Sequence, residues 1–461
     1  MNTRYLRLFF LCCFSHGGFQ AYGQHTPGAV EGSWSGHLEV AGTTLRIVFH
    51  LQLDEHDRLS ATMDSPDQGA RGIGMGEVTF QSDSLTIEAP VIAGKYEGVM
   101  TSDSTLEGTW SQAGQTFPLN LQRQLAPEVL NRPQEPQPPY PYREEEVTFE
   151  NEEQHFTLGG TLTLPRGSGP FPAVVLVSGS GSQNRDEEIF GHKPFKVIAD
   201  DLTRRGIAVL RYDDRGVGAS GGSAAGATSA DNATDAGAAI GYLKNREEID
   251  PERVGVIGHS EGGLIALMIA SEMKDLACIV LLAGPGVPGK TILLDQSEHI
   301  SRLSGIPENV IRQNREIMDR AYGWMASQAS YSAWTDSVKS NLEPLVANRI
   351  LNAVQEPSYA WLRYFVMSDP ATYFGSIQCP VLALNGEKDS QVLAEKNIAA
   401  IREGLEEAGN TQVTARVLPG LNHLFQPCDT GLPDEYGKIE WTFDQDALDM
   451  IASWLREVLH V

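Results

Sequence analysis

From about residue 147 onward, apolar runs of strand length alternate with segments of helical periodicity, and this alternation constrains the fold more than any other feature. The runs are rich in Val, Ile and Leu almost throughout, which suits strands buried on both faces of a parallel sheet. Strands that alternate with helices favour a doubly wound α/β domain. We predict strands over residues 172–177, 207–212, 253–257, 277–283, 381–384 and 414–418, and helices over 195–205, 235–245, 262–273, 393–408 and 447–459.

One interval departs from this rhythm. Residues from about 287 to 375 contain only helix-like segments rich in Trp, Tyr and Met. The interval is too long for a plain loop of a compact domain. We therefore expect a helical cap inserted into the α/β core.

The N-terminal part of the chain has a different pattern. Over residues 30–124, apolar and polar residues alternate in short runs separated by Gly, Asp and Ser, which indicates half-buried antiparallel strands. We expect a small β-barrel or sandwich there, with strands at 35–39, 44–53, 84–89, 108–110 and 117–121.

Six prolines between residues 127 and 141 then predict an extended, semi-rigid linker at 125–146. The α/β domain would occupy residues 147–461.

Residues 1–23 have the features of a secretory signal peptide. Arg4 and Arg7 precede the apolar stretch 8–14, and a small-x-small motif ends at Gly23. The apolar stretch is far shorter than the ~20 residues that a membrane span needs. We therefore expect export, to the periplasm or the outside of the cell.

The net charge narrows the range of partners. The chain has 60 Asp and Glu against 35 Lys and Arg, a formal net charge of −25. Such a surface would repel nucleic acid and an anionic membrane. The net charge excludes some partners but does not identify a function, so the function has to be inferred from sequence motifs.

Two G-x-S-x-G motifs occur, centred on Ser260 and Ser220. A nucleophile elbow requires a strand before the serine and a helix after it, because the serine sits on a strained turn between them. Ser260 follows the apolar run 253–257 and precedes a predicted helix, whereas a run of small residues follows Ser220. The sequence therefore predicts Ser260 as a nucleophile and Ser220 as part of a loop.

A serine nucleophile needs a histidine base, and the base needs a carboxylate that orients it. In this arrangement the acid and then the histidine follow the serine along the chain, each at the carboxyl end of a strand. Asp389 follows the strand at 381–384, with Glu387 as a local competitor, and His423 follows the strand at 414–418. We predict Asp389 and His423 in these roles, and expect the His259 side chain to point away from the site.

An oxyanion hole would use two backbone N–H groups. One belongs to the residue after the nucleophile, Glu261, and the other to the glycine-rich loop after the first core strand. In that loop, Ser180 and Gly181 are equal candidates.

With these residues placed, the chain resembles the α/β-hydrolase family over about residues 147–461. It is similar to secreted or periplasmic bacterial esterases, related to serine aminopeptidase-like hydrolases, that carry a small β-rich N-terminal domain. The resemblance implies an α/β-hydrolase fold and hydrolysis of carboxylic esters through an acyl-enzyme on Ser260, with no metal or organic cofactor. Ser178-Gly179 stands where many members have His-Gly. The matching segments are 178–182, 185–186, 191–195, 211–218, 258–263 and 422–426.

Other functions remain open at this point. A peptidase would need an acidic clamp for the substrate ammonium, for which Glu261, Glu298 or Glu316 are available. A thioesterase or acyltransferase would use the same serine, and a silent binding protein could use the β domain to contact a glycan or a protein. For a small ester substrate, the cap aromatics Trp361, Tyr364 and Phe365 are candidates for the pocket wall, although packing within the cap is as good an explanation for each.

Overall fold

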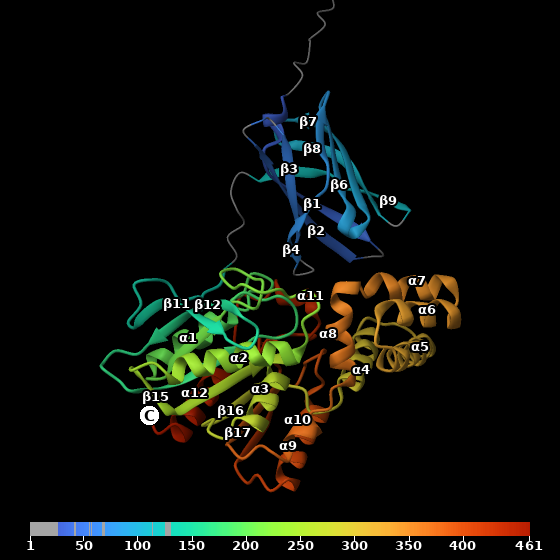
Figure 1. Ribbon diagram of the computed structural model, residues 1–461. Coiled ribbons are helices and arrows are strands. Elements are labelled where there is room, and N and C mark those ends of the chain that lie inside the picture. Colours follow the sequence, from blue (N-terminus) through green and yellow to red (C-terminus); the bar gives the residue numbers. More distant parts are fainter. Residues whose placement is uncertain are drawn as a thin grey trace, which may run out of the picture. The chain divides into compact units, whose positions relative to one another are not determined.

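The computed structural model describes residues 26–40, 43–54, 56, 58–66, 70–112, 114–124 and 131–461. The predicted signal peptide lies outside them. The chain divides into two compact units, Met1–Pro127 and Glu128–Val461, and each is described by itself (Figure 1).

The described part of the first unit forms one continuous antiparallel sheet. The strand order is β4-β3-β2-β1-β10-β8-β7-β6-β5, and β9 pairs with β8. The sheet curves as a half-barrel around a single aromatic core of Trp34, Phe49, Tyr96 and Trp110, so it is not a sandwich of two sheets. The predicted strand at 117–121 is wrong, because Leu119 and Asn120 separate two strands there. The elements are η1 (Pro27–Val30), β1 (Gly32–Val40), β2 (Thr43–Leu53), β3 (Leu59–Ser65), β4 (Ala70–Gly74), β5 (Val78–Gln81), β6 (Ser84–Ala89), η3 (Pro90–Ile92), β7 (Gly94–Ser102), β8 (Thr105–Gln112), β9 (Gln115–Pro118) and β10 (Leu121–Gln124).

The second unit is built on an eight-stranded sheet with the order β11-β12-β14-β13-β15-β16-β17-β18. β12 runs antiparallel to both of its neighbours, β11 and β14, and the rest of the sheet from β14 onward is parallel. The six predicted strands are all present, and the hairpin β11–β12 adds an antiparallel edge. The strands are β11 (Arg143–Asn151), β12 (Phe156–Leu164), β13 (Phe171–Val177), β14 (Ala208–Tyr212), β15 (Ile249–His259), β16 (Ile279–Leu282), β17 (Val381–Gly386) and β18 (Val413–Leu418).

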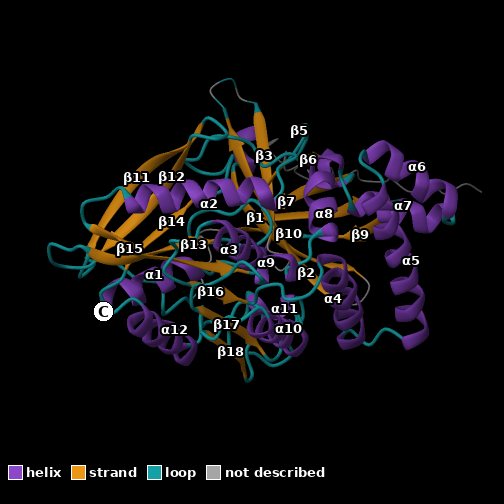
Figure 2. Cartoon of the chain, turned by 60° about the horizontal axis from the view of Figure 1, so that its bottom comes forward, coloured by secondary structure: helices purple, strands orange, loops and turns teal. Residues whose placement is uncertain are grey.

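Helices cover both faces of this sheet, as the continuous apolar strands require. Val175 and Val177 point to a core shared with α2, α3 and α10, whereas Val174 and Leu176 point to a core shared with α1 and α12. Figure 2 shows α1 and α12 side by side below the sheet. The helices of this core are α1 (Pro194–Arg204), α2 (Ser229–Lys244), α3 (Glu261–Glu272), α10 (Ala394–Glu407), α11 (Pro433–Tyr436) and α12 (Gln445–Val458).

The predicted cap is present between β16 and β17. Trp334, Tyr359 and Met325 form its own small core, and α8 connects it to α3 through Phe365 and Leu264. Its helices are α4 (Gly289–Leu303), α5 (Glu308–Ser327), α6 (Tyr331–Asn341), α7 (Pro344–Ala353), α8 (Glu356–Met367) and α9 (Ala371–Phe374).

The proline-rich segment differs from the expected linker in its second half. Arg132 donates hydrogen bonds to the carbonyl oxygens of Phe190, Gly191, Gly437 and Ile439. Gln134 donates to the Phe443 carbonyl and accepts from the backbone N–H groups of Thr442 and Phe443. Residues from 131 onward are therefore fastened to the catalytic unit, and β11 begins within the range predicted as linker.

Candidate active site

Ser260 lies on a strained turn between β15 and α3. Its backbone has φ 53° and ψ −118°, a conformation that costs energy in a residue with a side chain. The flanking glycines are required by space: a Cβ on Gly258 would lie 2.0 Å from the Gly262 carbonyl oxygen, and one on Gly262 would lie 2.1 Å from the Val177 carbonyl oxygen. Because Ser260 is also the N-cap of α3, its hydroxyl is placed at a helix end that favours negative charge.

The competing serine has a different environment. Ser220 lies in the loop between β14 and α2, where its hydroxyl donates to the Asp213 carbonyl oxygen at 2.6 Å. The same hydroxyl accepts the Gly159 backbone N–H at 3.0 Å. Ser220 thus closes a loop against β12.

His423 and Asp389 lie together at the carboxyl ends of neighbouring strands. Nδ1 of His423 lies 2.7 Å from Oδ2 of Asp389, and both side chains are buried. Asp389 also accepts the backbone N–H groups of Gln391 and Val392, which fix its carboxylate. Since a carboxylate only accepts, Nδ1 carries the proton, and in the neutral ring Nε2 carries the lone pair that a base needs. The competitor Glu387 instead accepts the Gly420 N–H at 3.0 Å and is exposed.

The loop after β13 is held by two carboxylates, Asp214, which is half-buried, and Glu187, which is buried. Asp214 accepts Ser178 Oγ at 2.8 Å and the Gln183 N–H at 2.9 Å. Glu187 accepts the Gly179 N–H at 2.7 Å, so that N–H is not available to a substrate. Burial raises the pKa of Asp214 to about 7. The candidates Ser180 and Gly181 lie between these two anchors.

A cavity of about 600 Å³ adjoins this loop. Ser180, Gly181 and Glu261 lie on its wall together with Trp361 from the cap, and alanines of the 224–227 segment form an apolar side. Its volume lies in the range of ligand pockets. All three candidates for the oxyanion hole therefore border a single cavity.

The Glu261 side chain connects the core to the cap. Its carboxyl group accepts Ser229 Oγ at 2.6 Å and the Trp361 indole N–H at 2.9 Å, and burial raises its pKa. Sequence reasoning missed this bond, because Ser229 and Trp361 lie far from Glu261 in the sequence.

The other cap candidates lie elsewhere. Phe365 and Tyr364 pack in the cluster that joins α8 to α3, so of the three predicted pocket aromatics only Trp361 lies on the cavity wall. Glu298 forms ion pairs with Arg302 and Arg315, and Glu316 is exposed on α5. Neither acid lies on the wall of this cavity.

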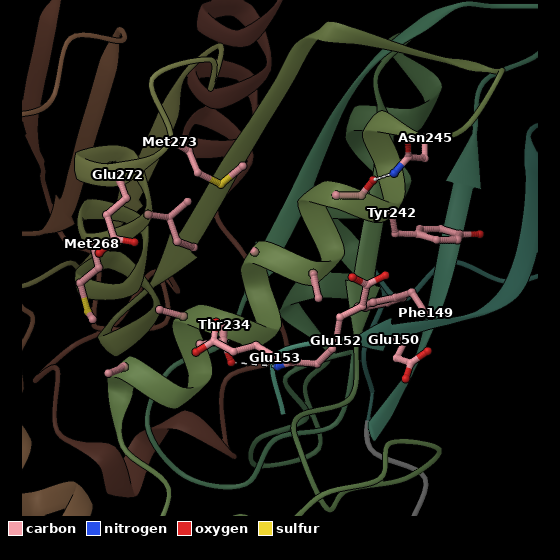
Figure 3. Close-up of a pocket in the computed structure, with 17 residues that line it drawn as sticks. Phe149, Glu150, Glu152, Glu153, Thr234, Tyr242, Asn245, Met268, Glu272 and Met273 are labelled. Atoms are coloured by element: carbon pink, nitrogen blue, oxygen red, sulfur yellow. Dashed lines mark hydrogen bonds between the residues drawn. The ribbon is translucent and has the colours of Figure 1, made fainter. Parts of the chain in front are cut away.

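A larger cavity, about 780 Å³, lies between the β11–β12 turn and the helices α2 and α3. Figure 3 shows Glu150, Glu152 and Glu153 on one side of it, with Met268 and Glu272 on the other. None of its lining residues is Ser, Cys or His. The smaller cavity is instead bordered by Glu261, the residue directly after Ser260, so it is the one that adjoins the nucleophile turn.

A second Ser–His–Asp series occurs in the β unit. Ser33 Oγ lies 2.8 Å from Nδ1 of His50, and Nε2 of His50 lies 2.9 Å from Asp64. Ser33 is the second residue of β1 and pairs with both β2 and β10. It lies within a paired strand, so this series lacks the strained strand-to-helix turn of the Ser260 site.

Within the described ranges, no three His, Cys, Asp or Glu side chains gather in a way that would hold a metal ion. Nor does any described helix combine the length and apolar character that crossing a bilayer requires.

Comparisons with known proteins identify the family of the chain. Two solved structures cover much of the chain at low similarity: the Pyrococcus furiosus esterase Pf2001 (19% identity, TM-score 0.44, 72% of this chain and 98% of that one) and hypothetical protein PA2218 of Pseudomonas aeruginosa (20% identity, TM-score 0.45, 72% and 98%). Esterase EstD of Thermotoga maritima is 30% identical over 318 residues, which span 69% of this chain and 68% of EstD. The profile of the family described as serine aminopeptidase, S33 (Hydrolase_4) matches residues 192–426. The chain therefore belongs to this family of α/β-hydrolases.

Proposed function

We propose that this protein is a serine hydrolase that cleaves carboxylic esters through an acyl-enzyme on Ser260. The observation that carries the proposal is the buried 2.7 Å pair of His423 and Asp389, in an α/β-hydrolase whose Ser260 occupies a strained strand-to-helix turn. Acyl transfer by a serine requires a base that is oriented in this way and a nucleophile on such a turn, and both observations support the proposal.

In the first half of the reaction, Oγ of Ser260 attacks the ester carbonyl carbon while Nε2 of His423 takes the hydroxyl proton. The N–H of Glu261 and that of Ser180 or Gly181 stabilise the oxyanion. The C–O bond to the alcohol then breaks, and His423 returns the proton to the leaving alkoxide. In the second half, His423 activates water, which attacks the acyl carbon and releases the acid and Ser260. Asp389 holds the imidazole tautomer and stabilises its cation throughout.

Esters are favoured over peptides by the state of Glu261. A clamp for a substrate ammonium needs a carboxylate that is charged and accessible to the substrate. Both oxygens of Glu261 already accept the Trp361 N–H, and burial raises the pKa of Glu261. The apolar alanines on the cavity wall suit an acyl or alkyl chain. The esterase name of the Thermotoga maritima relative supports the same choice.

The proposal is tested with the purified chain on aryl esters of graded acyl length, an acyl thioester and aminoacyl anilides. We expect turnover of the esters to exceed that of the anilides, and Ser260→Ala to abolish it. Ser220→Ala is the matched control, with chemistry retained in the folded enzyme. Faster cleavage of anilides would make the protein a peptidase, and faster cleavage of thioesters a thioesterase. Ester turnover that survives Ser260→Ala would refute the mechanism.

We further propose that the enzyme acts after export, supported by the charge and apolar pattern of residues 1–23. N-terminal sequencing of the protein from its own cell envelope is expected to start near Gln24. An intact Met1 in the active protein would contradict export by this route.

A further inference from the structure

His259, directly before Ser260, is buried and has an oxygen atom at each ring nitrogen. Nδ1 lies 2.8 Å from Oε1 of Glu187, and Nε2 lies 3.0 Å from the backbone carbonyl oxygen of His423. A carbonyl oxygen has no proton to give, and neither does a carboxylate. Both short contacts are hydrogen bonds only if both ring nitrogens donate.

The alternative is a proton on Glu187, and its other contact argues against it. The same oxygen, Oε1, accepts the Gly179 backbone N–H at 2.7 Å, and donors of this kind stabilise the charged carboxylate. Burial alone would lower the pKa of His259, but the charge and hydrogen bond of Glu187 outweigh this cost, and the pKa is raised. The pair is best described as an imidazolium and a carboxylate.

This pair connects three loops of the site. Glu187 holds Gly179, at the start of the loop that carries Ser180 and Gly181. The Nε2 bond holds the backbone of His423, whose ring centroid lies 4.9 Å from that of His259. The His259 backbone itself leads into the Ser260 turn. In enzymes, a misplacement of about 1 Å can slow a reaction about 100-fold, so contacts that hold these loops bear on the rate.

We propose that His259 is a positioning residue whose imidazolium is held between Glu187 and the main chain of His423. It fixes three segments relative to one another: the turn at Ser260, the loop that carries Ser180 and Gly181, and the loop that carries His423. The proposal rests on the proposed function for its kinetic consequence, but the protonation state of His259 stands apart from it.

The surroundings of His259 define how it titrates. Phe195 and Ile198 of α1, Leu282 of β16, and Leu424 and Phe443 are the apolar neighbours around it. The titratable groups that face it are Glu187, His423 and Asp389, and Asp214 interacts with Glu187. The pKa is raised, so the stability that this protonated pair contributes is complete below the ordinary value of about 6.5 and is lost as the pH rises through the folded-state pKa. The alkaline limb of kcat should therefore include the loss of this link.

The direct test is nitrogen NMR of the full-length chain with labelled histidine, using His259→Gln to assign the signals. We expect both His259 nitrogens to carry protons at pH 7 in the resting enzyme. An unprotonated His259 nitrogen at pH 7 would overturn the proposal. Since this measurement needs no turnover, it can fail or succeed independently of the ester hydrolysis.

The kinetic test is Glu187→Gln, which keeps the shape and removes the negative charge. We expect kcat to fall about 10- to 100-fold with KM within about threefold, and the alkaline limb to move to lower pH because His259 has lost its anionic partner. Glu248→Gln, at a paired surface glutamate, is the control and should move neither. A Glu187→Gln enzyme with a lowered melting temperature but the wild-type kcat and pH profile would show a merely structural contact and overturn the positioning role.

Discussion

Nδ1 of His423 and Oδ2 of Asp389 lie 2.7 Å apart, and neither side chain is open to solvent. Two backbone N–H groups fix the carboxylate from its other oxygen. The Asp389 carboxylate thus accepts the proton on Nδ1 of His423. In the neutral ring this leaves Nε2, on the side away from Asp389, without a proton.

The first prediction is therefore that Asp389→Asn lowers kcat about 10³- to 10⁴-fold with little change in fold, because the amide can stabilise the wrong tautomer of His423. Glu387→Gln is the matched control, and it should keep kcat within about twofold, since Glu387 only accepts the Gly420 N–H from an exposed position. Steady-state kinetics on an aryl ester and circular dichroism would measure both. Equal losses in the two variants would show that Asp389 has no special role.

The sheet and the order of the site were predictable because both depend on local patterns. The buried strands are continuous apolar runs, and the chain order of Ser260, Asp389 and His423 follows from the strand ends that they occupy. The β11–β12 hairpin was missed because β11 begins with Arg143 and three glutamates, a polar start to a strand with one exposed face. The early start of α2 was missed because its signal is the capping box of Thr228 and Asp231 and not an apolar run.

The links across the site could not be predicted, because they join residues that are distant in sequence. Glu187 reaches His259 over 72 positions, and Trp361 reaches Glu261 over 100. Trp361 and Phe365 stack on each other along α8, yet only Trp361 lies on the cavity wall. One turn along the helix, Phe365 meets Leu264 of α3 instead. The sequence shows that α8 is amphipathic, but it does not show at which residue its apolar face stops packing on the core and borders the cavity.

A second prediction concerns pH and Asp214. Its pKa is raised by burial from 3.8 to about 7, so the folded protein keeps this proton where the unfolded chain has lost it. The contribution to stability is complete below pH 3.8 and is lost as the pH rises through about 7. In Asp214→Asn, which resembles the protonated acid, the free energy of unfolding should fall less between pH 5 and pH 8 than in the wild type.

Urea unfolding at the two pH values measures this difference, which we expect to be on the order of 1–3 kcal/mol. The comparison between the two proteins removes the contribution of other titrating groups. An equal fall in both proteins would mean that Asp214 is already charged at pH 5.

A third prediction concerns the proline-rich segment. Arg132 donates to four carbonyl oxygens of the 190–191 and 437–439 segments, so Arg132→Ala leaves several of them without a donor. We expect a loss of about 2–3 kcal/mol in the free energy of unfolding of the catalytic unit. Arg302→Ala, at an exposed cap ion pair, should lower the free energy of unfolding clearly less than Arg132→Ala does. Equal stability of the two variants in urea unfolding would show that residues 131–142 act only as a tether.

The last prediction concerns the contact between cap and core. Trp361→Phe keeps the ring on the cavity wall and its stacking on Phe365, but removes the N–H that both Glu261 oxygens accept at 2.9 Å. With Ser229 as its remaining donor, the Glu261 carboxyl binds α8 less firmly, and the wall of the acyl pocket loosens. A lost hydrogen bond to a carboxyl of this kind corresponds to about 1.5 kcal/mol, or roughly tenfold in KM for long acyl chains. Short acyl esters, which reach less of the wall, should change less.

Trp324→Phe makes the same replacement on α5, away from this cavity, and should leave the whole acyl series unchanged. KM values measured across the series would decide: a uniform change in both variants would assign the effect to cap stability, and no change in Trp361→Phe would mean that the substrate does not use this cavity.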